Sequence, residues 1–225
     1  MRLYPLFISL AGCRVLVAGA GRVGRRKIAG LREAEARDIL VFDPGLALEA
    51  EQELSSLPGV RVFRRAVTEE DLDKCRLVFA ATDSRDENRR LAALCAARDI
   101  LCNVVDDPEN GTFHVPAHTR LQNLTAAFST GGRSPALAGR IRKDATVWLE
   151  QQYGQLLVFM ERLRPLVLAM DNGPERHGEL FRVFADSNLG EALARKDSRA
   201  ARETVAMLLP PSLHGHTEEL LDGLC

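Results

Sequence analysis

Residues 10–24, which read LAGCRVLVAGAGRVG, decide the fold of this chain. Residues 14–18 form a short, largely β-branched run that ends in glycines, which is typical of a buried parallel strand. The next six residues match the pattern G-x-G-x-x-G, and apolar residues at helical spacing follow in Val23, Ile28 and Leu31. A strand, a glycine turn and a helix in this order predict a dinucleotide-binding unit.

The same stretch has a second interpretation, because LAGC at 10–13 resembles the cleavage box of an exported lipoprotein. A signal peptide requires a basic segment and then roughly 7–15 apolar residues. Here only Arg2 is basic, and Pro5 and Ser9 interrupt the apolar run. The sequence therefore favours a cytoplasmic protein in which residues 3–10 form an apolar arm packed beside the first strand.

The composition is that of a soluble globular protein, with 225 residues, 46% hydrophobic and 27% charged. A net charge of -1 argues against a nucleic-acid partner held by bulk charge. The sequence contains no apolar run near the roughly 20 residues that span a bilayer, so no membrane partner is expected. Five cysteines without a C-x-x-C pair predict reduced thiols rather than a disulfide framework.

Strand and helix patterns alternate along the first half of the chain. Further strands are predicted at 39–42, 60–63, 77–81 and 100–105, with helices at 46–57 and 87–98. This alternation predicts an α/β fold with a parallel sheet and right-handed crossovers.

The alternation ends near Asp107. Possible strands at 113–115 and 124–129 come next, and then predicted helices at 137–153, 156–170, 179–185, 189–194 and 199–208. We therefore predict three parts: a dinucleotide-binding domain at 1–113, a connecting segment at 114–150 and a helical domain at 151–225.

The glycine turn predicts a cofactor site. Its first glycine allows a tight turn, its second lets a pyrophosphate approach the backbone, and its third lets helix and strand pack closely. Asp43 ends the second predicted strand, nineteen positions after Gly24, where a carboxylate binds ribose hydroxyls. This anion disfavours a 2′-phosphate and so favours NAD over NADP. The predicted cofactor-binding residues are Gly19, Ala20, Gly21, Arg22, Val23, Gly24, Asp43, Pro44, Thr82 and Asp83. Two alternatives stay open: a glycine turn without ligand, and Asp83 as a helix cap.

Four stretches, in order along the chain, resemble one family. They are YPLFISLAGCRVLVAGAGRVGRRK from Tyr4, AATDSRDEN from Ala80, CNVVDDPENGTFHVPA from Cys102 and FSTGGRSPALAGRIR from Phe128. Together they resemble the dehydrogenase/ferrochelatase module of siroheme synthases, which includes free-standing precorrin-2 dehydrogenases. The likeness covers residues 4–142. It departs from many members at Ala20 and Gly24, where those members carry glycine and alanine, and both changes fit the turn.

The resemblance implies a Rossmann-like domain and NAD-dependent oxidation of precorrin-2, a tetrapyrrole, to sirohydrochlorin in siroheme biosynthesis. Some members then insert Fe²⁺ to give siroheme, and the sequence leaves that step open. The resemblance also implies a homodimer, with 114–150 serving in dimerisation and substrate binding. The alternatives are an NAD(H)-sensing regulatory module, or an NAD-dependent oxidoreductase with another substrate on the same fold.

The resemblance also implies site residues. Asp106 is the implied acid/base carboxylate, although an Asp here is equally consistent with a structural role in the Asp-Pro turn, for which Asp107 is the better candidate. The predicted substrate-binding residues are Asn103, Ser129, Thr130, Gly131, Arg133 and Ser134. Asn103 could instead satisfy backbone groups, and Ser134 could instead cap a helix that begins at Pro135.

Substrate carboxylates call for cations. Two basic clusters are candidates, the first being Arg22, Arg25, Arg26 and Lys27 and the second Arg133, Arg140, Arg142 and Lys143. The histidine pairs His114/His118 and His214/His216 do not resemble a zinc site, and no metal site is predicted.

Overall fold

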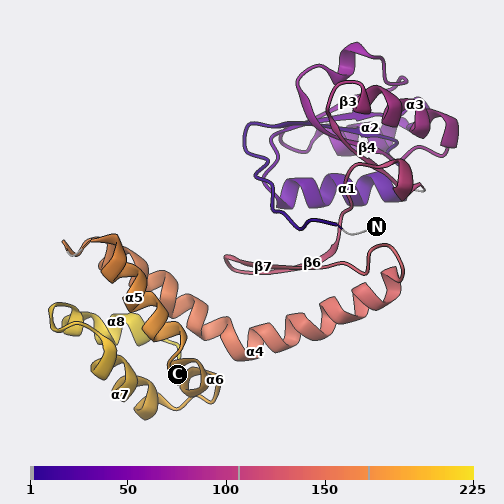
Figure 1. The fold of residues 1–225 in the computed structure, drawn as a ribbon. Helices are drawn as coiled ribbons and strands as arrows, with labels where there is room; N and C mark the ends of the chain where they lie inside the picture. Colours follow the sequence, from indigo (N-terminus) through magenta and orange to yellow (C-terminus); the bar gives the residue numbers. More distant parts are fainter. Residues whose placement is uncertain (1–2, 106, 172) are drawn as a thin grey trace. The chain divides into compact units, whose positions relative to one another are not determined.

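The computed structural model describes residues 3–105, 107–171 and 173–225. The chain divides into two compact units, Met1–Val115 and Pro116–Cys225. Figure 1 draws the first in indigo to magenta and the second in rose to yellow. We call them the sheet unit and the helical unit.

The sheet unit contains five parallel strands, as the alternating pattern predicts. They are β1 (Arg14–Ala18), β2 (Asp38–Phe42), β3 (Val60–Phe63), β4 (Cys75–Ala80) and β5 (Leu101–Val104), in the order β3-β2-β1-β4-β5. The direction of winding reverses between β1 and β4. Open parallel sheets bind ligands at such a reversal, beyond the carboxyl ends of the strands.

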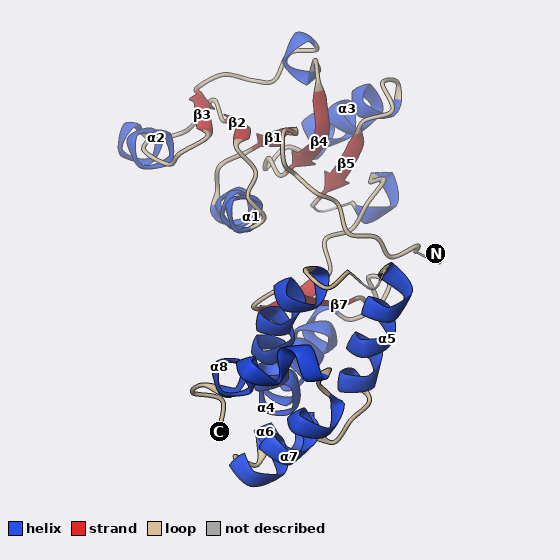
Figure 2. Ribbon diagram, turned by 90° about the vertical axis from the view of Figure 1, so that its left-hand side faces the viewer, coloured by secondary structure: helices blue, strands red, loops and turns tan. Residues whose placement is uncertain are grey.

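Helices cover both faces of this sheet. They are α1 (Arg22–Glu33), α2 (Leu48–Ser55) and α3 (Arg85–Ala96). Short 3₁₀ turns lie at Glu70–Leu72, between β3 and β4, and at Pro108–Asn110, after β5. One core joins Val15 and Val17 to Ile28, and the other joins Leu16 to Leu91. Figure 2 accordingly shows α1 and α2 on one side of the sheet and α3 on the other. Because both faces are covered, the four buried residues of β1 after Arg14 are all apolar.

The N-terminal arm differs from the expectation. Residues 3–9 are exposed, and only Leu10 packs into the core beside Val15. The physical reason is that β1 already pairs with β2 on one edge and with β4 on the other, so no edge remains for the arm.

The helical unit begins with an antiparallel hairpin of β6 (Ala117–Leu121) and β7 (Leu124–Phe128). Its helices are α4 (Pro135–Leu168), α5 (Pro174–Ala185), α6 (Leu189–Ala194), α7 (Ser198–Leu208) and α8 (Thr217–Leu221), with a 3₁₀ segment at Pro211–His216. Their core contains Phe159, Leu163, Phe184, Leu193 and Val205. No helix in the described ranges combines the length and the hydropathy that a membrane span requires.

Two predictions for the chain beyond β5 are wrong. Residues 113–115 form no strand, and the first strand of the hairpin starts at Ala117. The helices predicted at 137–153 and 156–170 are one helix, α4. A single interior glycine, Gly154, costs a helix only about 1 kcal/mol, and burial of Leu156 and Phe159 just beyond it offsets that cost. The division into three domains stays a prediction; α4 runs through residue 150.

Candidate functional site

The glycine turn between β1 and α1 has two crowded glycines and one open one. A Cβ on Gly19, where φ is 91°, would lie 2.3 Å from the carbonyl oxygen of Ala81. A Cβ on Gly24 would lie 1.9 Å from the carbonyl oxygen of Gly19. A Cβ on Gly21, in contrast, would meet no atom within 4 Å. The fold therefore requires the first and third glycines, while the second faces space that a ligand can enter.

The N-terminus of α1 opens onto this space. Its cap, Gly21, offers no side chain to the first amides, and the first turn contains no acidic residue. These unpaired amides and the helix dipole attract an anion. They border a cleft of about 220 Å³, lined by Gly21, Arg22, Val23, Ala81, Thr82, Asp83 and Val105. The cleft thus brings together predicted cofactor residues from the turn after β1 and the turn after β4.

Asp43 lies at the carboxyl end of β2 and fastens the glycine turn. One carboxylate oxygen, Oδ2, accepts a hydrogen bond of 2.8 Å from the amide of Ala20, and the other, Oδ1, accepts one of 2.9 Å from the amide of Gly45. Pro44, which lies between Asp43 and Gly45 in the chain, is exposed. Asp43 therefore has a structural contact that the spacing did not predict, and its contact with a ribose stays a prediction.

Thr82 is held by a residue that sequence reasoning missed. Asn88 of α3 is only 2% exposed, and its Oδ1 accepts hydrogen bonds from the amide and the hydroxyl of Thr82. Asn88 shares its helix face with the buried Leu91, Ala92 and Cys95. A polar residue in this apolar row was the available signal. Asp83 is exposed and does not cap α3, so that alternative is wrong: Ser84 caps α3 by accepting from the amide of Glu87.

Comparison with known proteins agrees with this geometry. Residues 6–117 match a family model described as "Putative NAD(P)-binding". The chain is 35% identical over 225 residues to a siroheme synthase of Enterobacter sp. (strain 638), covering 97% of this chain and 48% of that protein. It is 36% identical over 208 residues to a siroheme synthase of Pseudomonas entomophila (strain L48), covering 91% of this chain and 44% of that one. The chain thus spans about half the length of the curated relatives it matches.

A solved structure matches over nearly its whole length. It is named "SirC, precorrin-2 dehydrogenase", has 28% sequence identity and a TM-score of 0.74, and the match covers 92% of this chain and 98% of that one. These matches together cover almost the whole of this chain, and each relative is named as a siroheme synthase or a precorrin-2 dehydrogenase. The resemblance carried by the four motifs and the Rossmann-like fold are therefore confirmed, and the sheet unit is an NAD(P)-binding domain.

The family's proposed acid/base position, Asp106, lies outside the described residues. Its neighbour Asp107 holds the turn as predicted, because its Oδ2 accepts a hydrogen bond of 2.7 Å from Asn110 Nδ2. Asn103 donates from Nδ2 to the carbonyl oxygen of Phe113 at 3.0 Å. This contact is the backbone role that the sequence left open for Asn103, and a contact with substrate stays a prediction.

The loop at 129–134, where the family resemblance implies substrate contacts, binds three of its own amides, those of Gly131, Arg133 and Ser134. Ser129 Oγ accepts from the amide of Gly131 at 3.1 Å, and Thr130 Oγ1 accepts from the amide of Ser134 at 3.0 Å. Ser134 caps α4 through the amide of Leu137 at 3.3 Å, and Pro135 is the first helical residue, as the open alternative had it. Arg133 is exposed. The three hydroxyl groups keep their own protons as donors, and these are available to a ligand.

Some of the candidate cations have protein partners. Arg25 donates to Glu53 at 2.7 Å and to the carbonyl oxygen of Ala20 at 3.1 Å, and Arg140 pairs with Asp144 at 2.9 Å. Burial lowers the pKa of Lys27, whose Nζ lies 5.4 Å from the ring centre of Phe79. For Arg22, Arg26, Arg133, Arg142 and Lys143 a contact with substrate carboxylates stays a prediction.

The described residues contain no group of three His, Cys, Asp or Glu side chains suited to hold a metal ion. His214 Nε2 lies 2.8 Å from the carbonyl oxygen of Leu209, and His216 Nδ1 lies 3.0 Å from Glu219 Oε2. His118 Nδ1 lies 3.3 Å from the carbonyl oxygen of Pro116, while His114 Nε2 is buried without a hydrogen-bond partner in the described structure. Neither pair therefore offers a ligand set of the kind that zinc requires.

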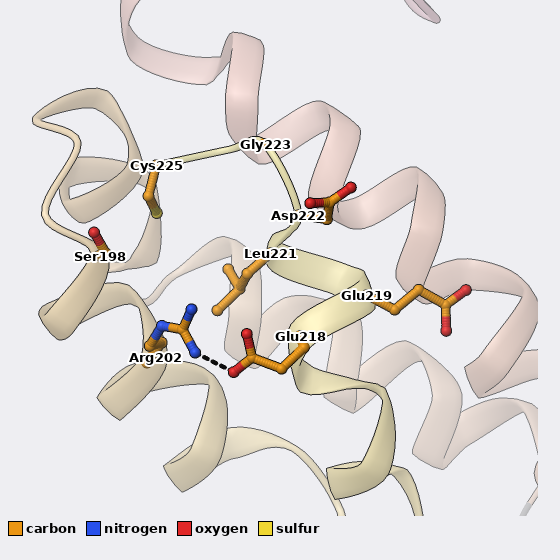
Figure 3. Close-up of a pocket in the computed structure, with 8 residues that line it drawn as sticks. All are labelled: Ser198, Arg202, Glu218, Glu219, Leu221, Asp222, Gly223 and Cys225. Carbon is orange, nitrogen blue, oxygen red and sulfur yellow. Dashed lines mark hydrogen bonds and ion pairs between the residues drawn. The ribbon is translucent and has the colours of Figure 1, made fainter.

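A second cavity, of about 480 Å³, lies in the helical unit between α7, α8 and the chain's last residues. Figure 3 shows that an ion pair between Arg202 and Glu218 crosses it, with Glu219 and Asp222 near by. Its lining contains Gly223 but no glycine turn before a helix, and it is rich in carboxylates. It therefore lacks the features that make the cleft of the sheet unit suitable for a dinucleotide.

Proposed function

We propose that this protein oxidises precorrin-2 to sirohydrochlorin with NAD⁺ as hydride acceptor. The observation that carries the proposal is the cleft at the winding reversal of the sheet, where Gly21 leaves room for a pyrophosphate beside the amides of α1. The match to a precorrin-2 dehydrogenase over 98% of its length supports the choice of substrate.

The chain's own groups have separable tasks in this reaction. The amides at Gly21 and the first turn of α1 bind the pyrophosphate, and Asp43 keeps the glycine turn in place. NAD⁺, when bound, supplies an acceptor for the hydride that leaves the macrocycle. Asp106 takes up the proton that leaves with it, because a carboxylate side chain is suited to general-base catalysis. Arg133 and the hydroxyl groups of the 129–134 loop bind substrate carboxylates.

The proposed cofactor is NAD rather than NADP. The Asp43 carboxylate lies at the end of β2, where it accepts hydrogen bonds from the ribose hydroxyls and repels a 2′-phosphate. We expect the protein to bind NADH at least about tenfold more tightly than NADPH, which corresponds to roughly 1.4 kcal/mol. Fluorescence titration of the reduced cofactors measures both affinities. Equal affinities would contradict the role of Asp43 in this choice.

The deciding experiment is an anaerobic assay of Asp106→Ala. The purified protein receives precorrin-2 and NAD⁺, and absorbance follows sirohydrochlorin. We expect the variant to lose turnover by about 10²-fold or more while it keeps its affinity for NADH. A variant that turns over normally would exclude Asp106 as the base and would favour a sensing module. Adding Fe²⁺ to the wild-type product then tests metal insertion through the conversion of the sirohydrochlorin spectrum.

We further propose that the protein is a cytoplasmic homodimer. Leu137, Ile141 and Trp148 follow helical spacing on α4, and they are 51%, 39% and 53% exposed. The neighbouring hairpin has only two strands, and such sheets rarely stand alone in water. A second copy of the chain would cover both. Trp148→Glu is expected to give a monomer in sedimentation velocity, and a wild-type protein that is itself monomeric would overturn the proposal.

A further inference from the structure

We infer that Asn88 is a positioning residue for the cofactor cleft, because its buried side-chain amide fixes the turn at Thr82 that forms one wall. The inference rests on the proposed NAD site in the sheet unit. Asn88 does not line the cleft, and it acts through Thr82, which does.

The contact between the two residues is complete on both sides of the Asn88 amide. Oδ1 of Asn88 accepts from the Thr82 amide at 3.1 Å and from the Thr82 hydroxyl at 2.7 Å. Nδ2 of Asn88 donates to the Thr82 carbonyl oxygen at 3.0 Å. The side chain therefore binds both backbone polar groups of one residue, as a neighbouring strand would. The Asn88 side chain is 2% exposed, so water cannot replace a lost hydrogen bond. Breaking one of these bonds therefore leaves a buried polar atom of the other residue without a partner.

The position of this turn controls the opposite wall as well. The Ala81 carbonyl oxygen, next to Thr82, lies where a Cβ on Gly19 would be 2.3 Å away. The turn after β4 and the glycine turn after β1 are thus packed backbone to backbone. A shift of Thr82 moves Ala81 against Gly19 and changes the opening in which the pyrophosphate is proposed to bind.

The hydroxyl of Thr82 is also committed. It donates to Asn88 at 2.7 Å and accepts from the amide of Ser84 at 3.3 Å. Its proton is therefore not available to a cofactor. Thr82 was predicted from the sequence as a cofactor-binding residue; it lines the cleft, and its contact with the cofactor stays a prediction beside the task of placing the wall.

Two substitutions of Thr82 test this without disturbing Asn88 itself. Thr82→Val keeps the shape and removes the hydroxyl, and we expect the Kd for NADH to rise about 5- to 10-fold, the effect of losing one buried hydrogen bond. Thr82→Ser keeps the hydroxyl and is expected to restore affinity to within about twofold. Asn88→Leu removes all three contacts and should raise the Kd more than tenfold.

The helical unit offers a matched control. Thr204 is 4% exposed, and its Oγ1 lies 2.9 Å from Asn188 Oδ1 and 2.8 Å from the carbonyl oxygen of Ala200. The first contact joins the same pair of side-chain types as Thr82 and Asn88. Thr204→Val removes an equivalent buried bond away from the cleft. It is expected to lower the melting temperature while leaving the Kd for NADH unchanged.

The readout is NADH fluorescence with no tetrapyrrole present, so it does not depend on turnover. A rise in Kd for Thr82→Val, reversed in Thr82→Ser and absent in Thr204→Val, supports the inference. If wild type binds NADH and Thr82→Val binds equally well with only a lower melting temperature, Asn88 is structural and the inference is overturned. If wild type itself binds no NADH, the proposed cofactor site fails instead. Should Asn88→Leu not fold, the two Thr82 variants still decide.

Discussion

The two units of this chain encode their structures in different ways. In the sheet unit the decisive positions lack side chains: a Cβ on Gly24 would lie 1.9 Å from a backbone oxygen. In the helical unit the decisive positions are large and apolar, and Phe159, Leu163 and Phe184 are 0% exposed. Where backbones approach closely, the sequence must contain glycines at fixed spacing, and this local motif indicates both the turn and the ligand that it can bind. Packing of side chains leaves a periodicity that indicates helices but says nothing of a ligand.

The largest expected effect is a loss of stability when one glycine of the turn is replaced, compared with a loss of NADH affinity when another is replaced. Gly24→Ala places a methyl group against the fixed carbonyl of Gly19, which no rotamer relieves, and we expect a loss of stability of about 4 kcal/mol or more. Gly21→Ala meets open space and should leave stability within about 1 kcal/mol of wild type. It should instead weaken NADH binding, because the added methyl occupies the approach of the pyrophosphate. Chemical denaturation and NADH titration measure the two effects.

Gly30 of α1 provides the control for that pair. A Cβ there would meet no atom within 4 Å, and the residue does not line the cleft. Gly30→Ala should therefore keep NADH affinity and gain slightly in helix stability. If Gly21→Ala binds NADH as well as Gly30→Ala does, the space beside Gly21 is not where the cofactor binds.

Much of the sheet unit could be predicted, because a strand, a glycine turn and an amphipathic helix each leave a local pattern. The role of Asn88 was not predicted: a polar residue in the apolar row of α3 was a signal, but its partner, Thr82, is known only from the fold. The continuity of α4 through Gly154 was missed because the stabilising contacts of Leu156 and Phe159 come from distant residues. The hydrogen bond from the Ala20 amide to Asp43 was not predicted. The spacing of the motif places a carboxylate near the turn, but it does not show which donor that carboxylate binds.

A substitution in the core of the helical unit tests whether NADH binding by the sheet unit requires the helical unit to be folded. Phe159→Ala removes a fully buried ring that contacts Phe184, with ring centres 5.1 Å apart. Such truncations cost about 3 to 5 kcal/mol through lost burial and the cavity left behind. We expect the helical unit to unfold early in a denaturant titration while NADH binding by the sheet unit persists. Loss of NADH binding in parallel with the helical signal would show that the two units unfold as one.

The smallest expected effect is a loss of stability at acid pH, which we expect from an ion pair of the sheet unit and not from one of the helical unit. In the sheet unit, hydrogen bonds from Arg65 at 2.6 and 2.7 Å hold the pKa of Asp71 at about 2 against its ordinary 3.8, although burial opposes the shift. A carboxyl whose pKa is lower in the folded state stabilises the fold above its unfolded pKa, and that stability is lost as pH falls through the folded value. Asp71 should therefore contribute about 1 to 2 kcal/mol at pH 6, with the loss falling between roughly pH 4 and pH 2.

Asp71→Asn removes this contribution, so its stability should differ from that of wild type at pH 6 and converge with it near pH 2. The helical unit supplies the contrast in Glu203, which pairs with Arg199 at 2.8 Å with both side chains largely exposed. Solvent and salt screen such a pair, so Glu203→Gln should change stability very little at either pH. Denaturant titrations at pH 6, 4 and 2 compare the two variants. A constant gap between Asp71→Asn and wild type across that range would mean that the fork to Arg65 acts through packing rather than through charge.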